Sequence, residues 1–120
     1  MKTVLIVEDV ELNRDLLVQL LQDDYRLLLA QDGQAALRQA KEQRPDLILM
    51  DLSLPKLDGW EATRRLKADA GLARIPVVVL SARAMRGDEE RARAAGCDAF
   101  LTKPIDETLL FATLSRHLAR

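Results

Sequence analysis

Residues 47–51, Leu-Ile-Leu-Met-Asp, join four consecutive apolar side chains to an aspartate. An apolar run without polar alternation is typical of a strand in a parallel sheet that helices cover on both faces. Two other runs, at 3–7 and 77–80, have the same character. We therefore expect a strand over 47–50 in the middle of a parallel sheet, with Asp51 just beyond its carboxyl end.

Segments of helical periodicity separate these runs from two further ones, at 26–30 and 99–102. Strands that alternate with helices indicate βαβ units around a parallel sheet. Five such rounds predict an α/β fold, a doubly wound five-stranded parallel sheet of the flavodoxin-like (βα)5 type with strand order 2-1-3-4-5. In such sheets, ligands bind beyond the carboxyl ends of the strands.

The predicted helices differ in how firmly they can be anchored. Their expected inner faces are Leu12, Leu16, Leu17, Leu20 and Leu21; Ala36, Leu37 and Ala40; Trp60, Thr63, Leu66 and Lys67; and Leu109, Leu110, Thr113 and Leu114. The fourth helix, over 85–95, offers only Met85 and alanines, so we expect it to be the least firmly anchored. Gly96 is expected to end that helix in a left-handed cap, and Asp106 to cap the start of the last helix.

Composition limits the classes of function. The 120 residues suit one domain spanning 1–120, with no internal repeat. The 18 basic and 19 acidic residues give a net charge of -1, which offers no general attraction to nucleic acid or to a membrane surface. The single cysteine, Cys97, excludes an internal disulfide. No signal-peptide pattern or apolar stretch of about 20 residues is visible, so we expect a cytoplasmic protein.

Chemically active side chains follow four of the five apolar runs. They are Glu8 and Asp9, Asp51, Ser81 and Lys103. In the order 2-1-3-4-5 these four strands are contiguous, so their carboxyl ends should bring the five side chains together. Three carboxylates in a partly dry cleft repel one another unless one stays protonated or a cation neutralises them.

A magnesium ion is the expected cation, because the group offers oxygen ligands and no nearby His or Cys. Asp51 could then attack a phosphoryl group and form an aspartyl-phosphate. Lys103 would supply a second positive charge to the phosphoryl oxygens, and the Ser81 hydroxyl a hydrogen bond.

Four motifs resemble those of response-regulator receiver domains of two-component signalling: Val-Glu-Asp at 7–9, Asp-Leu-Ser-Leu-Pro-Lys-Leu-Asp-Gly at 51–59, Ser-Ala at 81–82 and Lys-Pro at 103–104. Their order and spacing are more specific than any single motif. The resemblance covers essentially the whole chain and is closest to single-domain receivers, particularly over 9–13 and 85–91.

The resemblance implies a role for each matching residue. Asp51 would be the phosphoacceptor, and Lys103, in a cis bond to Pro104, would be the cation that binds the phosphoryl group. Asp9 would bind the metal directly, Glu8 would bind it through water, and the Ser53 backbone carbonyl would be a further ligand. Ser81 would be the switch hydroxyl and Phe100 the switch aromatic.

The resemblance also implies a function. A histidine kinase or a histidine phosphotransfer protein would donate the phosphoryl group to Asp51. The surface of the fourth helix, fifth strand and fifth helix would then switch and control downstream protein partners. Such a domain is no conventional enzyme, although it catalyses its own phosphorylation and dephosphorylation. We expect a monomer or weak homodimer.

The sequence lacks the motifs of two other classes of protein. A phosphatase of the haloacid-dehalogenase type would carry an Asp-x-Asp motif after the first strand, and a dinucleotide binder would need a glycine-rich first turn. Neither motif is present. Two alternatives stay open: a receiver excised from a larger transcription regulator or hybrid kinase, and a phosphate-independent interaction module. Met1 and the end at Arg120 favour a stand-alone protein over the first.

Some of these side chains also have plain structural interpretations. Glu8 and Asp9 could cap the first helix. Trp60 is expected to serve in packing and Cys97 to be a small buried residue. His117, in the last turn of a helix, is expected to interact with the helix dipole rather than to relay phosphate.

Overall fold

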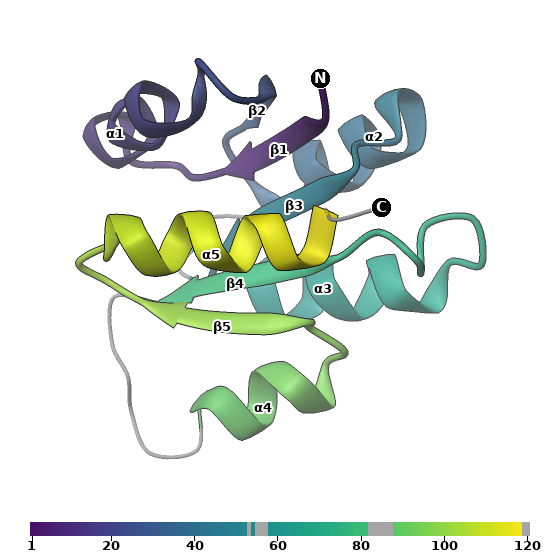
Figure 1. Cartoon of the computed structure of the whole chain (residues 1–120). Helices are drawn as coiled ribbons and strands as arrows, with labels where there is room; N and C mark the ends of the chain where they lie inside the picture. Colours follow the sequence, from purple (N-terminus) through teal and green to yellow (C-terminus); the bar gives the residue numbers. More distant parts are fainter. Residues whose placement is uncertain (53, 55–57, 82–87, 119–120) are drawn as a thin grey trace.

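Five parallel strands form one sheet in the order β2-β1-β3-β4-β5 (Figure 1). This computed structural model describes residues 1–52, 54, 58–81 and 88–118. The strands are β1 Thr3–Val7, β2 Arg26–Ala30, β3 Leu47–Asp51, β4 Val77–Ser81 and β5 Ala99–Thr102. The predicted fold class and strand order are confirmed. β3 and β4 each run one residue further than expected, so Asp51 and Ser81 are the last residues of their strands.

The strand register aligns the carboxyl ends of the inner strands. Val7 pairs with Met50 and Asp51 pairs with Leu80. Ser81 in turn pairs with Thr102. Because all the strands run the same way, the residues that follow Val7 and Thr102 emerge at the same sheet edge as Asp51.

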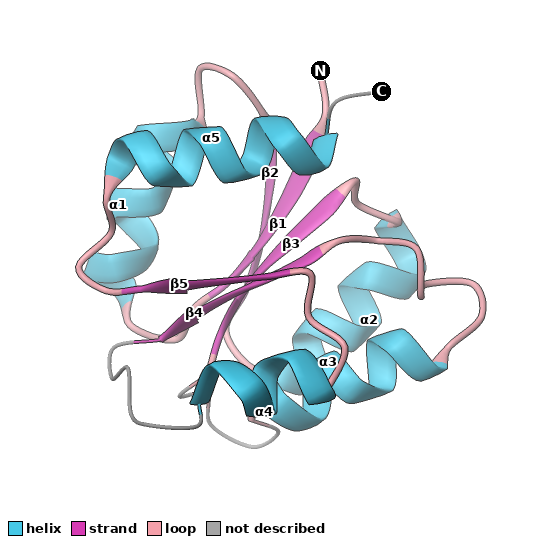
Figure 2. Cartoon of the chain, turned by 60° about the horizontal axis from the view of Figure 1, so that its bottom comes forward, coloured by secondary structure: helices cyan, strands magenta, loops and turns pink. Residues whose placement is uncertain are grey.

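The described residues form five helices, which cover the two faces of the sheet (Figure 2). They are α1 Glu11–Leu21, α2 Gly33–Gln43, α3 Gly59–Ala68, α4 Asp88–Ala94 and α5 Glu107–Leu118. α1 and α5 lie on one face, α2 and α3 on the other, and α4 lies beside α3. Each face has its own apolar core, as expected for a doubly wound sheet.

The helix ends follow ordinary capping chemistry. The carboxylates of Asp32, Asp58 and Asp106 accept hydrogen bonds from main-chain N–H groups in the first turns of α2, α3 and α5. Gly96 has a φ of 101°, the left-handed conformation predicted for the residue that stops the fourth helix. α4 is described from Asp88 onward, and the expected start at Met85 lies outside the described residues.

The predicted inner faces of α1 and α5 were partly wrong. Leu12 is 78% exposed, Leu16 49% and Leu109 52%. The buried stripe of α1 consists of Leu17 and Leu21. At about 100° per residue, Leu12 and Leu16 lie a quarter turn or more away from that stripe. The leucines span a wider arc than the sheet can cover.

Within the described ranges, no helix is both long and apolar enough to cross a membrane.

Candidate functional site

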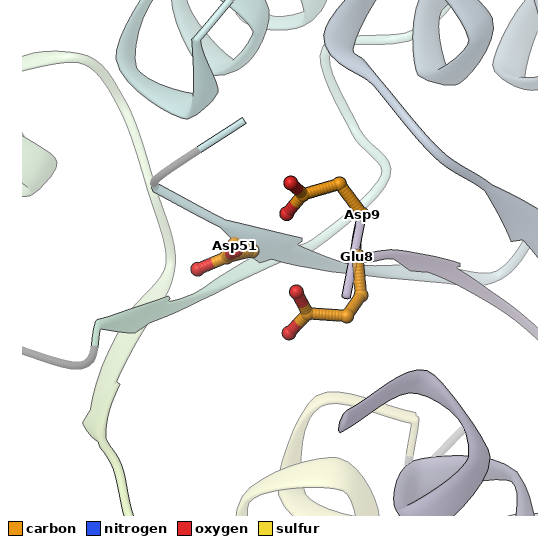
Figure 3. Close-up of side chains that lie close together, drawn as sticks. All are labelled: Glu8, Asp9 and Asp51. Carbon is orange, nitrogen blue, oxygen red and sulfur yellow. The ribbon is translucent and has the colours of Figure 1, made fainter. Parts of the chain in front are cut away.

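Three carboxylates converge at the carboxyl edge of the sheet (Figure 3). Glu8 and Asp9 directly follow β1, and Asp51 ends the adjacent strand β3. One carboxylate oxygen from each lies within 4.8 Å of the others. Glu8 and Asp51 are 1% and 3% exposed, whereas Asp9 is exposed. The predicted convergence of these groups is therefore present.

Lys103 faces this acidic cluster from the residue after β5. Its Nζ donates a hydrogen bond to Glu8 Oε1 at 2.7 Å and approaches Asp51 Oδ1 at 3.5 Å. Burial by itself lowers the pKa of Lys103, but the hydrogen bond to Glu8 and the charges of Asp51 and Glu8 outweigh it, so the pKa is raised. The ammonium is thereby held in its charged form. The bond from Lys103 to Pro104 is cis, as the resemblance implied.

Glu8 is also tied to the start of α1. Its Oε2 accepts a hydrogen bond from the Val10 N–H at 3.2 Å, and Val10 occupies the N-cap position without a side-chain cap bond. The Glu8 carbonyl accepts a hydrogen bond from Arg14 Nη1 at 3.0 Å. Arg14 was missed in the sequence analysis, where its only signal was its place in the helix that follows the acidic pair.

The two residues predicted to act in the switch lie on neighbouring strands. Ser81 ends β4 and is 4% exposed, next to Thr102 of β5. Phe100, in β5, is partly buried and packs against the core on the α2 and α3 side of the sheet. Ser53, whose carbonyl was expected to bind metal, lies outside the described residues.

This arrangement fits a hard divalent cation. Two buried carboxylates and a third at the rim face one ammonium group among the residues described, so the cluster keeps an excess of negative charge. Oxygen donors with no His or Cys are those that Mg²⁺ prefers. The structure thus brings together Glu8, Asp9 and Asp51, the three carboxylates expected at a magnesium site.

The other residues singled out from the sequence, Trp60, Cys97 and His117, lie outside the acidic cluster. Trp60 is partly buried, and the Arg91 guanidinium of α4 lies 4.7 Å from the centre of its ring. Cys97 is buried. His117 lines a surface hollow with Lys2 at the amino ends of the strands, opposite the acidic cluster.

Comparisons with known proteins agree with this geometry. Residues 4–115 match the family model described as response regulator receiver domain. The polar-differentiation response regulator DivK of Brucella anthropi is 46% identical over 118 residues, which are 98% of this chain and 96% of the relative.

Solved structures give the same result. The receiver domain of the sensor histidine kinase PA1611 from Pseudomonas aeruginosa, which has a magnesium ion coordinated in its active site cleft, superposes with a TM-score of 0.92 at 38% identity, covering 99% of this chain and 98% of that one. The chemotaxis protein CheY4 of Vibrio cholerae gives 0.91 at 29% identity, covering 98% and 99%. The chain thus belongs to the response regulator receiver domain family of two-component signalling.

Proposed function

We propose that this chain, as one receiver domain over 1–120, accepts a phosphoryl group on Asp51 in the presence of Mg²⁺. One observation carries the proposal. One carboxylate oxygen from each of Glu8, Asp9 and Asp51 lies within 4.8 Å of the other two, and the Lys103 ammonium faces them. A buried aspartate beside two other acids and a lysine is poorly explained as a helix cap or turn former.

The chemistry follows from these groups. A carboxylate oxygen of Asp51 attacks the phosphorus of a phosphohistidine, the P–N bond breaks, and the imidazole leaves. A bound Mg²⁺ would neutralise the charge on the phosphoryl oxygens, with Asp9 and Asp51 as its direct ligands, Glu8 acting through water and the Ser53 carbonyl as a further donor. Lys103 stabilises the same oxygens from the β5 side, and the Ser81 hydroxyl donates a hydrogen bond to one of them.

The switch would pass from this site to α4, β5 and α5. Phosphorylation adds negative charge and acceptor oxygens beside Ser81, whose strand pairs with β5. Movement of Ser81 and Phe100 would then bias the surface of those three elements. The described side chains of α4, at positions 90, 91, 93 and 94, are all exposed, which supports a weakly anchored helix.

Exposed apolar residues beside the site offer a surface for the phosphodonor. They are Val10, Leu12 and Leu16, each at least 47% exposed. The first of them, Val10, directly follows Asp9 in the chain. A histidine kinase or histidine phosphotransfer protein must bring its histidine to Asp51, so it must cover this rim. An amphipathic helix of that partner would bury these side chains. The signalling would take place in the cytoplasm.

Intact-mass measurement tests the proposal. Incubation with a small acyl phosphate and Mg²⁺ should add one phosphoryl group to the wild-type protein and none to Asp51→Asn. Asp15→Asn, at an exposed position of α1, is the matched control and should label like the wild type. Equal labelling of Asp51→Asn would contradict the assignment. A pull-down of partners with and without a phosphoryl mimic would then separate a switch from a phosphate-independent module.

A further inference from the structure

The ammonium of Lys103 contacts both Glu8 and Asp51, and its contact with Glu8 is the shorter one. Its distance to Glu8 Oε1 is 2.7 Å, the length of a strong charge-assisted hydrogen bond, whereas Asp51 Oδ1 lies at 3.5 Å. The other oxygen of Glu8 is occupied by the Val10 N–H. Both oxygens of this buried carboxylate therefore have a hydrogen-bond partner. One of these partners is Lys103, which the proposed chemistry needs at the phosphoryl oxygens.

Burial makes this contact costly to break. A carboxylate that is 1% exposed cannot regain water when its counter-ion leaves, so an uncompensated charge would stay in the protein interior. The ammonium can leave Glu8 at small cost only when another cation replaces it. The nearest site for such a cation is the cluster formed by Glu8, Asp9 and Asp51.

We propose that Glu8 is the positioning residue of Lys103, holding the ammonium beside Asp51 until a divalent cation takes over the charge of the acidic cluster. The inference rests on the proposed function and adds a coupling to it. Lys103 and the divalent cation compete for the same carboxylates, so each weakens the binding of the other by the same factor. Lys103 becomes available to phosphoryl oxygens only once the metal is bound.

The length of the Glu8 side chain is the feature that this coupling requires. Glu8→Asp keeps the negative charge but removes one methylene, so the carboxylate no longer reaches Lys103 at 2.7 Å. A residue that acted only through metal-bound water would tolerate this change. A positioning residue would lose its hold on the ammonium while the cluster still bound metal.

Nuclear magnetic resonance of the lysine ammonium groups tests the proposal directly. Lys67 serves as an internal control, because its Nζ donates to Asp98 Oδ2 at 2.8 Å and to two main-chain carbonyls at the other end of the sheet. In metal-free wild-type protein, Lys103 and Lys67 should both give slowly exchanging signals. Added Mg²⁺ should shift or broaden only the Lys103 signal, with a midpoint equal to the calorimetric Kd for Mg²⁺.

Two variants complete the test. Lys103→Met should bind Mg²⁺ more tightly, on the order of tenfold, because the competing charge is removed. Glu8→Asp should lose the slowly exchanging Lys103 signal without metal and still bind Mg²⁺. A Lys103 signal that stays unchanged at saturating Mg²⁺ would overturn the inference. The absence of any calorimetric Mg²⁺ binding would instead contradict the proposed function itself.

Discussion

Gly59, the first residue of α3, lies directly against the main chain of Asp51 at the end of β3. A Cβ atom on Gly59 would be 2.3 Å from the Asp51 carbonyl oxygen and 2.8 Å from the Leu52 Cα. Real Cβ atoms essentially never approach main-chain atoms this closely. The Gly59 N–H also donates to the Leu52 carbonyl at 3.2 Å. The start of α3 and the strand end that carries Asp51 thus form one closely packed unit, which only glycine permits.

Gly59→Ala should therefore disturb both the fold and the site. We expect a loss of about 1–3 kcal/mol in the free energy of unfolding, the usual cost of overpacking a core. Phosphorylation of Asp51 should also become slower, because the methyl group displaces the Asp51 backbone. Urea denaturation and intact-mass time courses measure the two effects. Gly71→Ala is the control, since its Cβ would meet nothing closer than 3.4 Å and should leave both values unchanged.

The exposed leucines of α1 should matter for the protein phosphodonor and not for stability. Leu12→Gln with Leu16→Gln should change the free energy of unfolding by less than about 0.5 kcal/mol, because neither side chain is in the core. Phosphotransfer from a histidine phosphotransfer protein should slow, while labelling by a small acyl phosphate should not. Leu29→Gln, at a 43% exposed position of the edge strand β2, should affect neither. Equal slowing with both donors would contradict the docking role of α1.

Lys67 should stabilise the fold at the amino ends of β4 and β5 through its hydrogen bonds. Its ammonium donates to the carbonyls of Ala73 and Ile75 and to Asp98, whose carboxylate also accepts from the Val77 N–H. Lys67→Met leaves these acceptors without the ammonium and should lower the free energy of unfolding by about 1.5–3 kcal/mol. Chemical denaturation checks this value against Lys41→Met, an exposed lysine of α2 whose loss should cost less than about 0.5 kcal/mol.

The raised pKa of Lys103 predicts a loss of stability at alkaline pH. Its contribution should be fully present below the unfolded-state pKa of about 10.4 and should decline as pH rises through the higher folded-state pKa. The difference in unfolding free energy between the wild type and Lys103→Met, measured with chelator, isolates this group from other lysines and Tyr25. That difference should be constant from neutral pH to about pH 9 and shrink above about 10.4. A difference that declines already well below that pH would mean that burial dominates and lowers the pKa.

Much of the fold could be predicted because strand patterns are local. Apolar runs such as 77–80 have no polar alternation, so both faces had to be covered, and the order 2-1-3-4-5 followed from common topology. The exposure of Leu12 and Leu16 could not be predicted in the same way. Periodicity shows that a helix has an apolar side but not how wide a strip of that side the sheet will cover.

The site likewise has features that the sequence determines and features that only the tertiary structure decides. The sequence by itself determined that Glu8, Asp9, Asp51 and Lys103 would meet, because each lies at or just beyond the carboxyl end of a strand and parallel strands end at one edge. Only the tertiary structure decided that Lys103 lies closer to Glu8, 95 positions away, than to Asp51, 52 positions away. Such a preference depends on side-chain positions differing by less than an ångström, which are set by the packing of three strands together and by no local pattern of residues.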